Sequence, residues 1–393
     1  MPSLRQLFLD RLAPTSPEPL GLEIEKAEGV FLFDKDGKKY LDAISGIGVS
    51  SLGHCHPAVV KAVQQQAETY MHTMVYGEYV LSPQVQYANL LCSQLPETLN
   101  SIYYVNSGAE AAEGAMKLAK RVTGRSRIIA CKNAYHGSTH GAMSLMSDPT
   151  FTQAFRPLVP DIHFIEFNSF EDLQKIDENV AAVIMEPVQG EAGVIPPVPG
   201  YLKSVKDKCS EEGALLVFDE VQTGFGRTGS LFAFQKFGVV PDVLMLAKGM
   251  GGGMPIGAFV ANRDLMEQFS HDPILGHITT FGGHPVSCAA ALATLKTLLS
   301  EKIVESVNEK GEYLASKLTH PGIKQVRQVG LMIAVELDSF SQVKMVIESA
   351  IRNGVIVDWF LFNDHSIRIA PPLIISLEEL NLMTKVIFEG ISL

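Results

Sequence analysis

The sequence predicts an α/β protein with a large domain built on a mixed, mostly parallel sheet and a smaller α+β domain. Short apolar runs alternate with helical patterns up to about residue 285, as expected for a parallel sheet that helices cover on both faces. Beyond that point a long helical region, Cys288–Leu318, precedes isolated strand-like runs. The length of 393 residues is sufficient for two or more domains.

The strands expected in the large sheet are short and almost continuously apolar, which is typical of strands buried on both faces. They are Ile102–Asn106, Arg127–Cys131, the runs that start at His163 and Val180, Gly213–Asp219 and Val243–Ala247. The first of them leads directly into SGAEAAEGAMKLAKRV, which is a helical pattern. We therefore expect helices to connect the strands of this sheet.

Both ends of the chain are expected to contribute to the smaller domain. Near the N-terminus, strands at Val30–Phe33 and Lys39–Leu41 flank an Asp-Gly turn, which predicts a hairpin. Near the C-terminus, a helix separates strands at Val329–Leu337 and Ser366–Ala370. The expected division is a segment 1–45 that packs with the small domain, a large ligand-binding domain 46–287 and the small domain 288–393.

The composition narrows the classes of partner. With 43 acidic against 32 basic residues, the formal net charge is −11, which argues against nucleic acid or an anionic membrane as the main partner. The N-terminus lacks the uninterrupted apolar core of a signal peptide, and no stretch reaches the roughly 20 apolar residues of a membrane-spanning helix. The five cysteines are scattered and form no CxxC pair. We therefore expect reduced thiols, a cytoplasmic location and no metal site.

Three of the apolar runs end in a charged residue. Glu186 follows VAAVIM, Asp219 ends GALLVFD and Lys248 follows VLMLA. Glycine-rich segments, QTGFGRTG and GMGGG, come directly after the second and third of these residues. Because ligands of open parallel sheets bind at the carboxyl ends of the strands, this pattern predicts a ligand site there.

The residue types at this edge predict the chemistry of the ligand. A desolvated Lys248 can supply a neutral amine that forms a Schiff base, and Asp219 can pair with a protonated pyridine nitrogen. The helix that opens at Ser107–Glu110 offers backbone N–H groups to a phosphate. Tyr135 can lie flat on an aromatic ring. Together these groups specify pyridoxal 5′-phosphate, whereas GMGGG lacks the spacing of a dinucleotide site.

These residues lie in motifs that are characteristic of one family. LVFDEVQTGFGRTG is followed by PDVLMLAKGMGGGMPIGA, and further motifs run from DKDGKKYLDAISGIGVSSLGHCHP to SIRIAPPL. The chain resembles the class III pyridoxal-phosphate aminotransferases, which have the aspartate-aminotransferase-type fold (fold type I). GIGVSSLGHCHP and YHG are most similar to the ornithine and acetylornithine branch.

The resemblance implies roles around the cofactor ring. Lys248 would form the Schiff base with the cofactor and then move a proton between the substrate carbon and the cofactor. Asp219 would keep the pyridine nitrogen protonated. Val221 and Tyr135 would pack on the two faces of the ring, and Gln222 would bond its hydroxyl group.

The resemblance also implies how the phosphate is held. Ser107, Gly108 and Ala109 would bind it within the chain. Thr280, in HITTFGGHP, would reach the phosphate of the neighbouring subunit. A homodimer with shared active sites would then be obligatory for activity.

The substrate residues follow from the same resemblance. Arg368 would bind the α-carboxylate of glutamate or 2-oxoglutarate, and Glu191 would neutralise Arg368 while an ω-amine occupies the site. Such a pair lets one pocket accept two different amines in a ping-pong cycle. We interpret Glu186 and His136 as groups that support the site by hydrogen bonding.

Two departures from the branch bear on the amino donor. Ser138 stands where the branch usually has an arginine that holds a substrate carboxylate, and Ile47 stands where ornithine aminotransferases have a tyrosine. We expect a transaminase that moves an amino group from an ω-amino donor, N-acetylornithine or ornithine as first guess, to 2-oxoglutarate. Alternatives are a 4-aminobutyrate or other ω-amine aminotransferase, an aminomutase or decarboxylase of the same fold, a non-enzymatic relative and a nucleotide-binding dehydrogenase.

Overall fold

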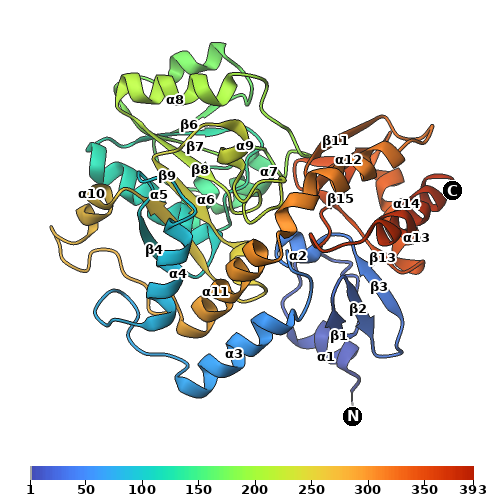
Figure 1. The fold of residues 1–393 in the computed structure, drawn as a ribbon. Helices are drawn as coiled ribbons and strands as arrows, with labels where there is room; N and C mark the ends of the chain where they lie inside the picture. The colour runs from blue at the N-terminus through green and yellow to red at the C-terminus, as the bar shows by residue number, and fades with distance from the viewer. Residues whose placement is uncertain (1) are drawn as a thin grey trace.

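A seven-stranded sheet lies at the centre of the larger part of the computed structural model, which describes residues 2–393 (Figure 1). Its strands, in spatial order, are β4 (Ser101–Val105), β10 (Gly257–Ala261), β9 (Val243–Leu246), β8 (Leu215–Asp219), β7 (Val180–Met185), β5 (Arg127–Cys131) and β6 (Ile162–Ile165). All neighbours pair in parallel except at β10, which is antiparallel to both β4 and β9. The predicted mostly parallel sheet is confirmed, and β10 is the strand that the sequence analysis did not assign.

Helices cover both faces of this sheet and both of the smaller sheets. The α-helices are α1 (Leu4–Arg11), α2 (Ser45–Gly48), α3 (Pro57–Thr69), α4 (Ser82–Cys92), α5 (Gly108–Thr123), α6 (His140–Ser144), α7 (Pro149–Thr152), α8 (Tyr201–Glu212), α9 (Ala233–Phe237), α10 (Arg263–Met266), α11 (Pro285–Ser300), α12 (Val307–Lys317), α13 (Phe340–Arg352) and α14 (Leu377–Ile391). Short 3₁₀ turns are η1 (Gln153–Phe155), η2 (Glu171–Lys175), η3 (Lys248–Gly251), η4 (Glu267–Phe269) and η5 (Ile303–Ser306). Within residues 2–393, every helix is too short or too polar to cross a membrane.

The alternation of side chains along a strand divides the interior into two cores. In the fully buried strand β7, Val183 and Met185 belong to the core that contains α8. Ala182 and Ile184 point the other way, into the core that contains α5. Because both faces of the sheet are covered, polar groups of these strands can reach a ligand only at the strand ends.

Two four-stranded sheets lie beside the large one. The first is β1 (Ile24–Glu28), β2 (Phe31–Asp34), β3 (Lys39–Asp42) and β13 (Val355–Ile356). The second is β11 (Gln325–Val329), β12 (Met332–Glu336), β15 (Asn363–Ile369) and β14 (Asp358–Phe360). Since β13 pairs in parallel with β3, the blue N-terminal strands lie beside the orange and red C-terminal elements (Figure 1). We propose on this basis that the chain divides at residues 45 and 287, as expected.

Two predictions for the C-terminal region are confirmed in type but not in continuity, since helices α11 and α12 and strand β12 lie largely within the predicted runs. The run Val329–Leu337 is not one strand, because Gly330 has a φ of +58° and turns the chain between β11 and β12. The helical region Cys288–Leu318 is interrupted after α11, where Lys302 is left-handed with a φ of +54° and η5 follows. A pattern of apolar residues alone does not reveal such a change of backbone direction.

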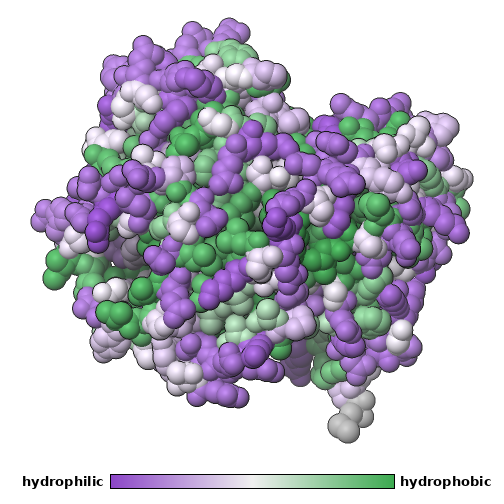
Figure 2. Space-filling model, in the orientation of Figure 1, coloured by the Kyte–Doolittle hydropathy of each residue, from purple (hydrophilic) through white to green (hydrophobic). Residues whose placement is uncertain are grey.

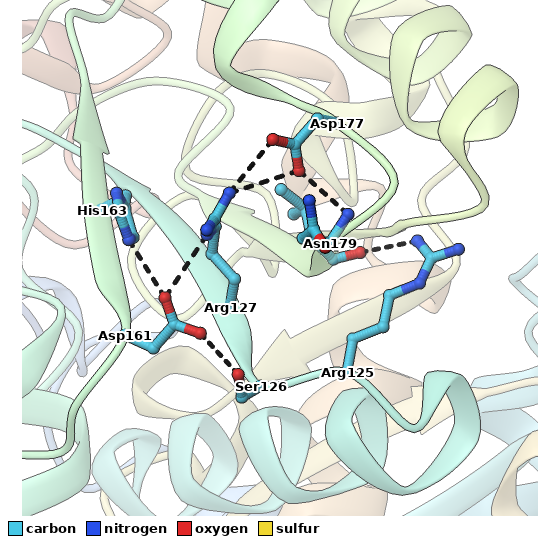
Figure 3. Close-up of polar contacts among 8 residues, drawn as sticks. Arg125, Ser126, Arg127, Asp161, His163, Asp177 and Asn179 are labelled. Carbon is cyan, nitrogen blue, oxygen red and sulfur yellow. Dashed lines mark hydrogen bonds and ion pairs between the residues drawn. The ribbon is translucent and has the colours of Figure 1, made fainter.

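Two arginines tie together the amino ends of the parallel strands (Figure 3). Arg125 donates to the carbonyl of Val180, the first residue of β7, at 2.9 Å and to that of Glu212 at 2.8 Å. Arg127 lies 3.4 Å from a carboxylate oxygen of Asp161 and 3.1 Å from one of Asp177. This network holds β5, β6 and β7 at the edge of the sheet opposite to Asp219 and Lys248.

We predict that Arg125→Ala destabilises the protein more than Arg127→Ala does. Arg125 makes two charge-assisted bonds to backbone carbonyls, whose loss costs about 2 kcal/mol or more, whereas partly exposed ion pairs contribute about 1 kcal/mol at most. Thermal unfolding of the cofactor-loaded proteins measures the difference, with Lys203→Ala, which removes an exposed pair with Asp207, as the control. A melting temperature of Arg125→Ala equal to or above that of Arg127→Ala would contradict the prediction.

Candidate active site

A cavity of about 450 Å³ opens at the carboxyl ends of β8 and β9. It brings together most of the residues that the sequence analysis selected from distant parts of the chain. Those that line it are Ser107, Gly108, Ala109, Tyr135, Glu191, Asp219, Val221, Gln222 and Lys248. Of the two remaining residues, Arg368 bonds to Glu191 and Thr280 lies outside the cavity, on an exposed loop.

The amine of the site comes from Lys248, the first residue of η3 after strand β9. Its φ of +45° is unusual for a residue with a side chain, and strained backbone of this kind is frequent at functional sites. Burial lowers the pKa of Lys248, although the charges of Glu191 and Asp219 act in the opposite direction. At a given pH, the amine of Lys248 is therefore neutral and nucleophilic in a larger fraction of molecules than the amine of an exposed lysine.

Asp219 ends the neighbouring strand β8 and is held by two groups. Its Oδ2 lies 2.7 Å from Nδ1 of His136, and its Oδ1 accepts a hydrogen bond from the N–H of Val221 at 2.9 Å. Burial works against protonation of His136, but the hydrogen bond to Asp219 and its charge raise the pKa of the imidazole. The carboxylate is thus fixed in one orientation at the cavity wall.

Glu186 adds a second buried carboxyl group to the cavity wall. Its Oε1 accepts from the N–H of Gly190 at 2.9 Å. Among the described residues, Oε2 of Glu186 and Nε2 of His136 are buried without a hydrogen-bond partner. Burial raises the pKa of Glu186 to about 7, and the nearby charge of Asp219 adds to this shift. From the sequence, Glu186 and His136 were interpreted as supporting groups. Their buried atoms without a partner could bond to a polar ligand.

The start of α5 forms a cradle for an anion. The side chain and carbonyl of Ser107 satisfy the N–H groups of Glu110 and Ala111, which leaves the amides of Gly108 and Ala109 at the positive end of the helix. A Cβ on Gly108 would lie 2.9 Å from Val221, and one on Gly257 would lie 2.3 Å from the carbonyl oxygen of Ser107. Glycine at both positions keeps the cradle open.

A bidentate ion pair lies on the side of the cavity that faces the small sheets. Nη1 and Nη2 of Arg368 donate to the two carboxylate oxygens of Glu191 at 2.6 and 2.7 Å. Burial would raise the pKa of Glu191, but the charge of Arg368 outweighs it and the pKa is lowered. Gln222 donates to the same carboxylate at 3.4 Å. The pair is therefore fully charged and linked to a residue that lines the cavity.

Several residues that line the cavity carry no charge. The hydroxyl groups of Tyr135 and Ser138 lie 3.0 Å apart, and Val49, Met254 and Pro255 line the same cavity. Asn106, which was not predicted from the sequence, also lines the cavity. Its side-chain amide donates to the hydroxyl group of Thr279 at 3.0 Å. Its position directly after strand β4 is the signal that applied to the other strand-end residues.

The residues of this cavity fit pyridoxal 5′-phosphate. Lys248 supplies a primary amine, Asp219 an oriented carboxylate for a pyridinium nitrogen, and Tyr135 an aromatic ring on the cavity wall. The open amides of Gly108 and Ala109 suit a phosphate. In the described part of the chain, acidic, histidine and cysteine side chains form no cluster that could hold a metal ion.

We predict that Gly257→Ala weakens binding of pyridoxal 5′-phosphate by about tenfold or more, because forcing a methyl group against a backbone carbonyl costs about 1–3 kcal/mol. The clash would displace Ser107 and with it the amides of the cradle. Titration of the apoprotein with the cofactor, followed by absorbance, measures the change. Gly238→Asn is the control, since a Cβ there meets no atom within 4 Å and asparagine tolerates its left-handed backbone. Unchanged affinity in Gly257→Ala would refute the cradle.

Comparison with known proteins agrees with this geometry. The family pattern of the class-III aminotransferases matches residues 12–391. An acetylornithine aminotransferase of Methanosarcina acetivorans is 42% identical over 371 residues, which cover 93% of this chain and 91% of the relative. One from Clostridium acetobutylicum is 40% identical over 370 residues, covering 91% and 93%.

Solved structures give the same result. The ornithine aminotransferase from Toxoplasma gondii, which was found with partial occupancy of pyridoxal phosphate, superimposes with a TM-score of 0.89 at 30% identity, covering 98% of this chain and 92% of that one. The chain therefore belongs to the class-III aminotransferases, and it is a transaminase that depends on pyridoxal phosphate.

Proposed function

We propose that the protein moves an amino group from an ω-amino donor to 2-oxoglutarate in a ping-pong cycle. The observation that supports this most directly is the buried pair of Arg368 and Glu191 beside the cavity of Lys248. An arginine that is reversibly covered by a carboxylate can bind the α-carboxylate of glutamate in one half of the cycle. In the other half the covered arginine presents no net charge to a donor that has no carboxylate on its reacting carbon.

Pyridoxal 5′-phosphate supplies an electron-withdrawing ring that stabilises negative charge on the substrate carbon. Lys248 binds the cofactor through its amine and, once released, carries a proton at Nζ to and from the reacting carbon. Its lowered pKa suits this role, because a base needs a neutral amine. Asp219, fixed by His136 and the amide of Val221, holds a proton on the pyridine nitrogen.

The remaining cavity residues orient the ring and exclude water. Tyr135 and Val221 pack against its two faces, and Gln222 bonds its hydroxyl group. Gly108 and Ala109, with Ser107, bind the phosphate at the start of α5. By holding the ring in one orientation, these residues would reduce the entropic part of the barrier.

Two observations bear on the identity of the amino donor, namely the relatives of the chain and the uncharged residue Ser138 in the cavity. N-acetylornithine or ornithine is our first candidate, because the two relatives described above are acetylornithine aminotransferases. The second candidate is an ω-amine without a carboxylate at its distal end, such as a simple alkyl amine. It is favoured by Ser138, whose hydroxyl group bonds to Tyr135 and gives an anion no charge-assisted contact.

A homodimer with shared active sites is part of the proposal. Exposed apolar side chains occur on two segments that meet at one cavity, residues 71–85 and 274–281, among them Val80 (91% exposed) and Phe281 (53%). Hydrophobic side chains also gather across the middle of the face shown in Figure 2. Such surface is usually covered by a partner, and Thr280 lies in the second segment.

The five free cysteines support a reducing, cytoplasmic location.

The decisive test is the half-reaction. The cofactor-loaded enzyme is mixed separately with glutamate, N-acetylornithine, ornithine, 4-aminobutyrate and 1-aminopentane, which has no carboxylate, and the loss of the aldehyde-form absorption band is timed. We expect rapid conversion by glutamate and by at least one ω-amine. Lys248→Ala, which lacks the base, is the control and should show no turnover.

Each result has a distinct meaning. No conversion by glutamate would refute the assignment of Arg368 and Glu191. Conversion by glutamate and N-acetylornithine would support the first donor and show that another group replaces the arginine absent at position 138. Conversion by glutamate but not N-acetylornithine would favour the second candidate. Release of carbon dioxide would indicate a decarboxylase instead.

We predict that Glu191→Gln shifts specificity towards glutamate. The amide cannot neutralise Arg368, so an ω-amine meets an uncompensated charge, and kcat/KM for the ω-amine should fall about tenfold or more relative to glutamate. Steady-state or half-reaction kinetics with both substrates measure the ratio. An equal loss with both substrates would indicate a structural role for Glu191.

A further inference from the structure

Three consecutive residues of strand β14 enclose the guanidinium group of Arg368. Strand β14 pairs with β15, and Asp358 lies directly opposite Arg368 in the register. The carbonyl of Trp359 accepts from Nη2 at 2.9 Å, and the ring of Phe360 lies 4.7 Å from the guanidinium carbon. Oδ1 of Asp358 lies 3.1 Å from Nε.

Arg368 is therefore in contact with two carboxylates. Glu191 binds both terminal nitrogens, whereas Asp358 lies beside Nε. Within residues 2–393, neither Oδ1 of Asp358 nor Nε of Arg368 has an aligned hydrogen-bond partner. Asp358 thus acts on Arg368 through its charge more than through directed bonding.

The two carboxylates differ in their freedom to move away. Glu191 lies in the loop after β7, and a substrate carboxylate would take its place on Nη1 and Nη2. Asp358 belongs to the same sheet as Arg368 and stays beside Nε during that exchange. An incoming anion then meets an arginine whose charge the ionised Asp358 already compensates in part.

We propose that Asp358 is a specificity-determining residue that weakens the hold of Arg368 on a substrate carboxylate and so favours release of glutamate and 2-oxoglutarate. The inference rests on the proposed function, in which Arg368 receives that carboxylate. It predicts that only the substrates whose carboxylate binds Arg368 respond to Asp358, because an ω-amine that leaves Glu191 in place does not compete with Asp358.

The charge of Asp358 is also sensitive to pH near neutrality. Burial raises the pKa of Asp358 to about 7. Arg368 on β15 lowers it, while Glu191 in the loop after β7 and Asp42 on β3, itself 2.8 Å from His54, raise it. Protonation removes the opposing charge, so the KM for 2-oxoglutarate should fall as the pH decreases through this value.

The test compares Asp358→Asn with Asp364→Asn in the cofactor-loaded enzyme. Asp364 is an exposed carboxylate of the same strand as Arg368, so both variants change the net charge equally. Above neutral pH, Asp358→Asn should lower the KM for glutamate and 2-oxoglutarate about three- to tenfold. The KM for the fastest of N-acetylornithine, ornithine and 4-aminobutyrate should change less than about twofold, and Asp364→Asn should change neither.

A second measurement uses the pH dependence of the wild-type enzyme. In the wild-type enzyme, the KM for 2-oxoglutarate is measured from one pH unit above to one below the pKa of Asp358, and it should approach the Asp358→Asn value at the lower end. Parallel changes with both substrate classes, a raised KM for 2-oxoglutarate in Asp358→Asn, or a pH dependence retained in that variant would overturn the inference. Absence of any wild-type reaction with glutamate would instead refute the proposed function, and this inference with it.

Discussion

The burial of the central strands on both faces is the constraint on which the rest of the structure depends. Strand β7, with the sequence VAAVIM, is buried at every position, so an ionisable group within it would lie in an apolar core without water or partners. The chemistry therefore lies at the strand ends, where Glu186, Asp219 and Lys248 follow three neighbouring strands. Parallel pairing brings these ends to one edge, and the site follows from the architecture of the sheet.

The two edges of the sheet use charged residues in different ways. At the amino ends, Arg125 and Arg127 are bonded to carbonyl and carboxylate oxygens, and their bonds hold strands together. At the carboxyl ends, His136 and Glu186 retain buried atoms without a partner. Satisfied groups stabilise the fold, whereas unsatisfied ones cost free energy unless a ligand completes them. The contrast separates the structural edge from the catalytic one.

The sequence was sufficient for six strands of the large sheet and for the charged residues at their ends because both depend on local patterns, whereas Val221, Gln222 and Glu191 were assigned from the family resemblance. Apolar runs revealed the buried strands, and the charged residues after them revealed the edge. Turns inside apolar runs were not evident, as Gly330 shows, because a change in the sign of φ leaves the hydrophobic pattern intact. Strand β10 was missed since it directly follows the glycine-rich loop. Contacts across a register, such as that of Asp358 with Arg368, depend on the pairing of β14 and β15 and have no local signal.

In the proposed function, the ion pair of Arg368 and Glu191 would let one pocket accept two kinds of substrate. Breaking a buried ion pair by removing one partner is costly, because the other charge is left without compensation. Replacing the Glu191 carboxylate with that of a substrate avoids this cost, since the number of charges on Arg368 stays the same. The bond of Arg368 to Glu191 and its bond to the substrate carboxylate then differ little in free energy. A third charge near Arg368 can therefore shift the equilibrium between them. Asp358, fixed to the same sheet at 3.1 Å from Nε, is in the position to do so.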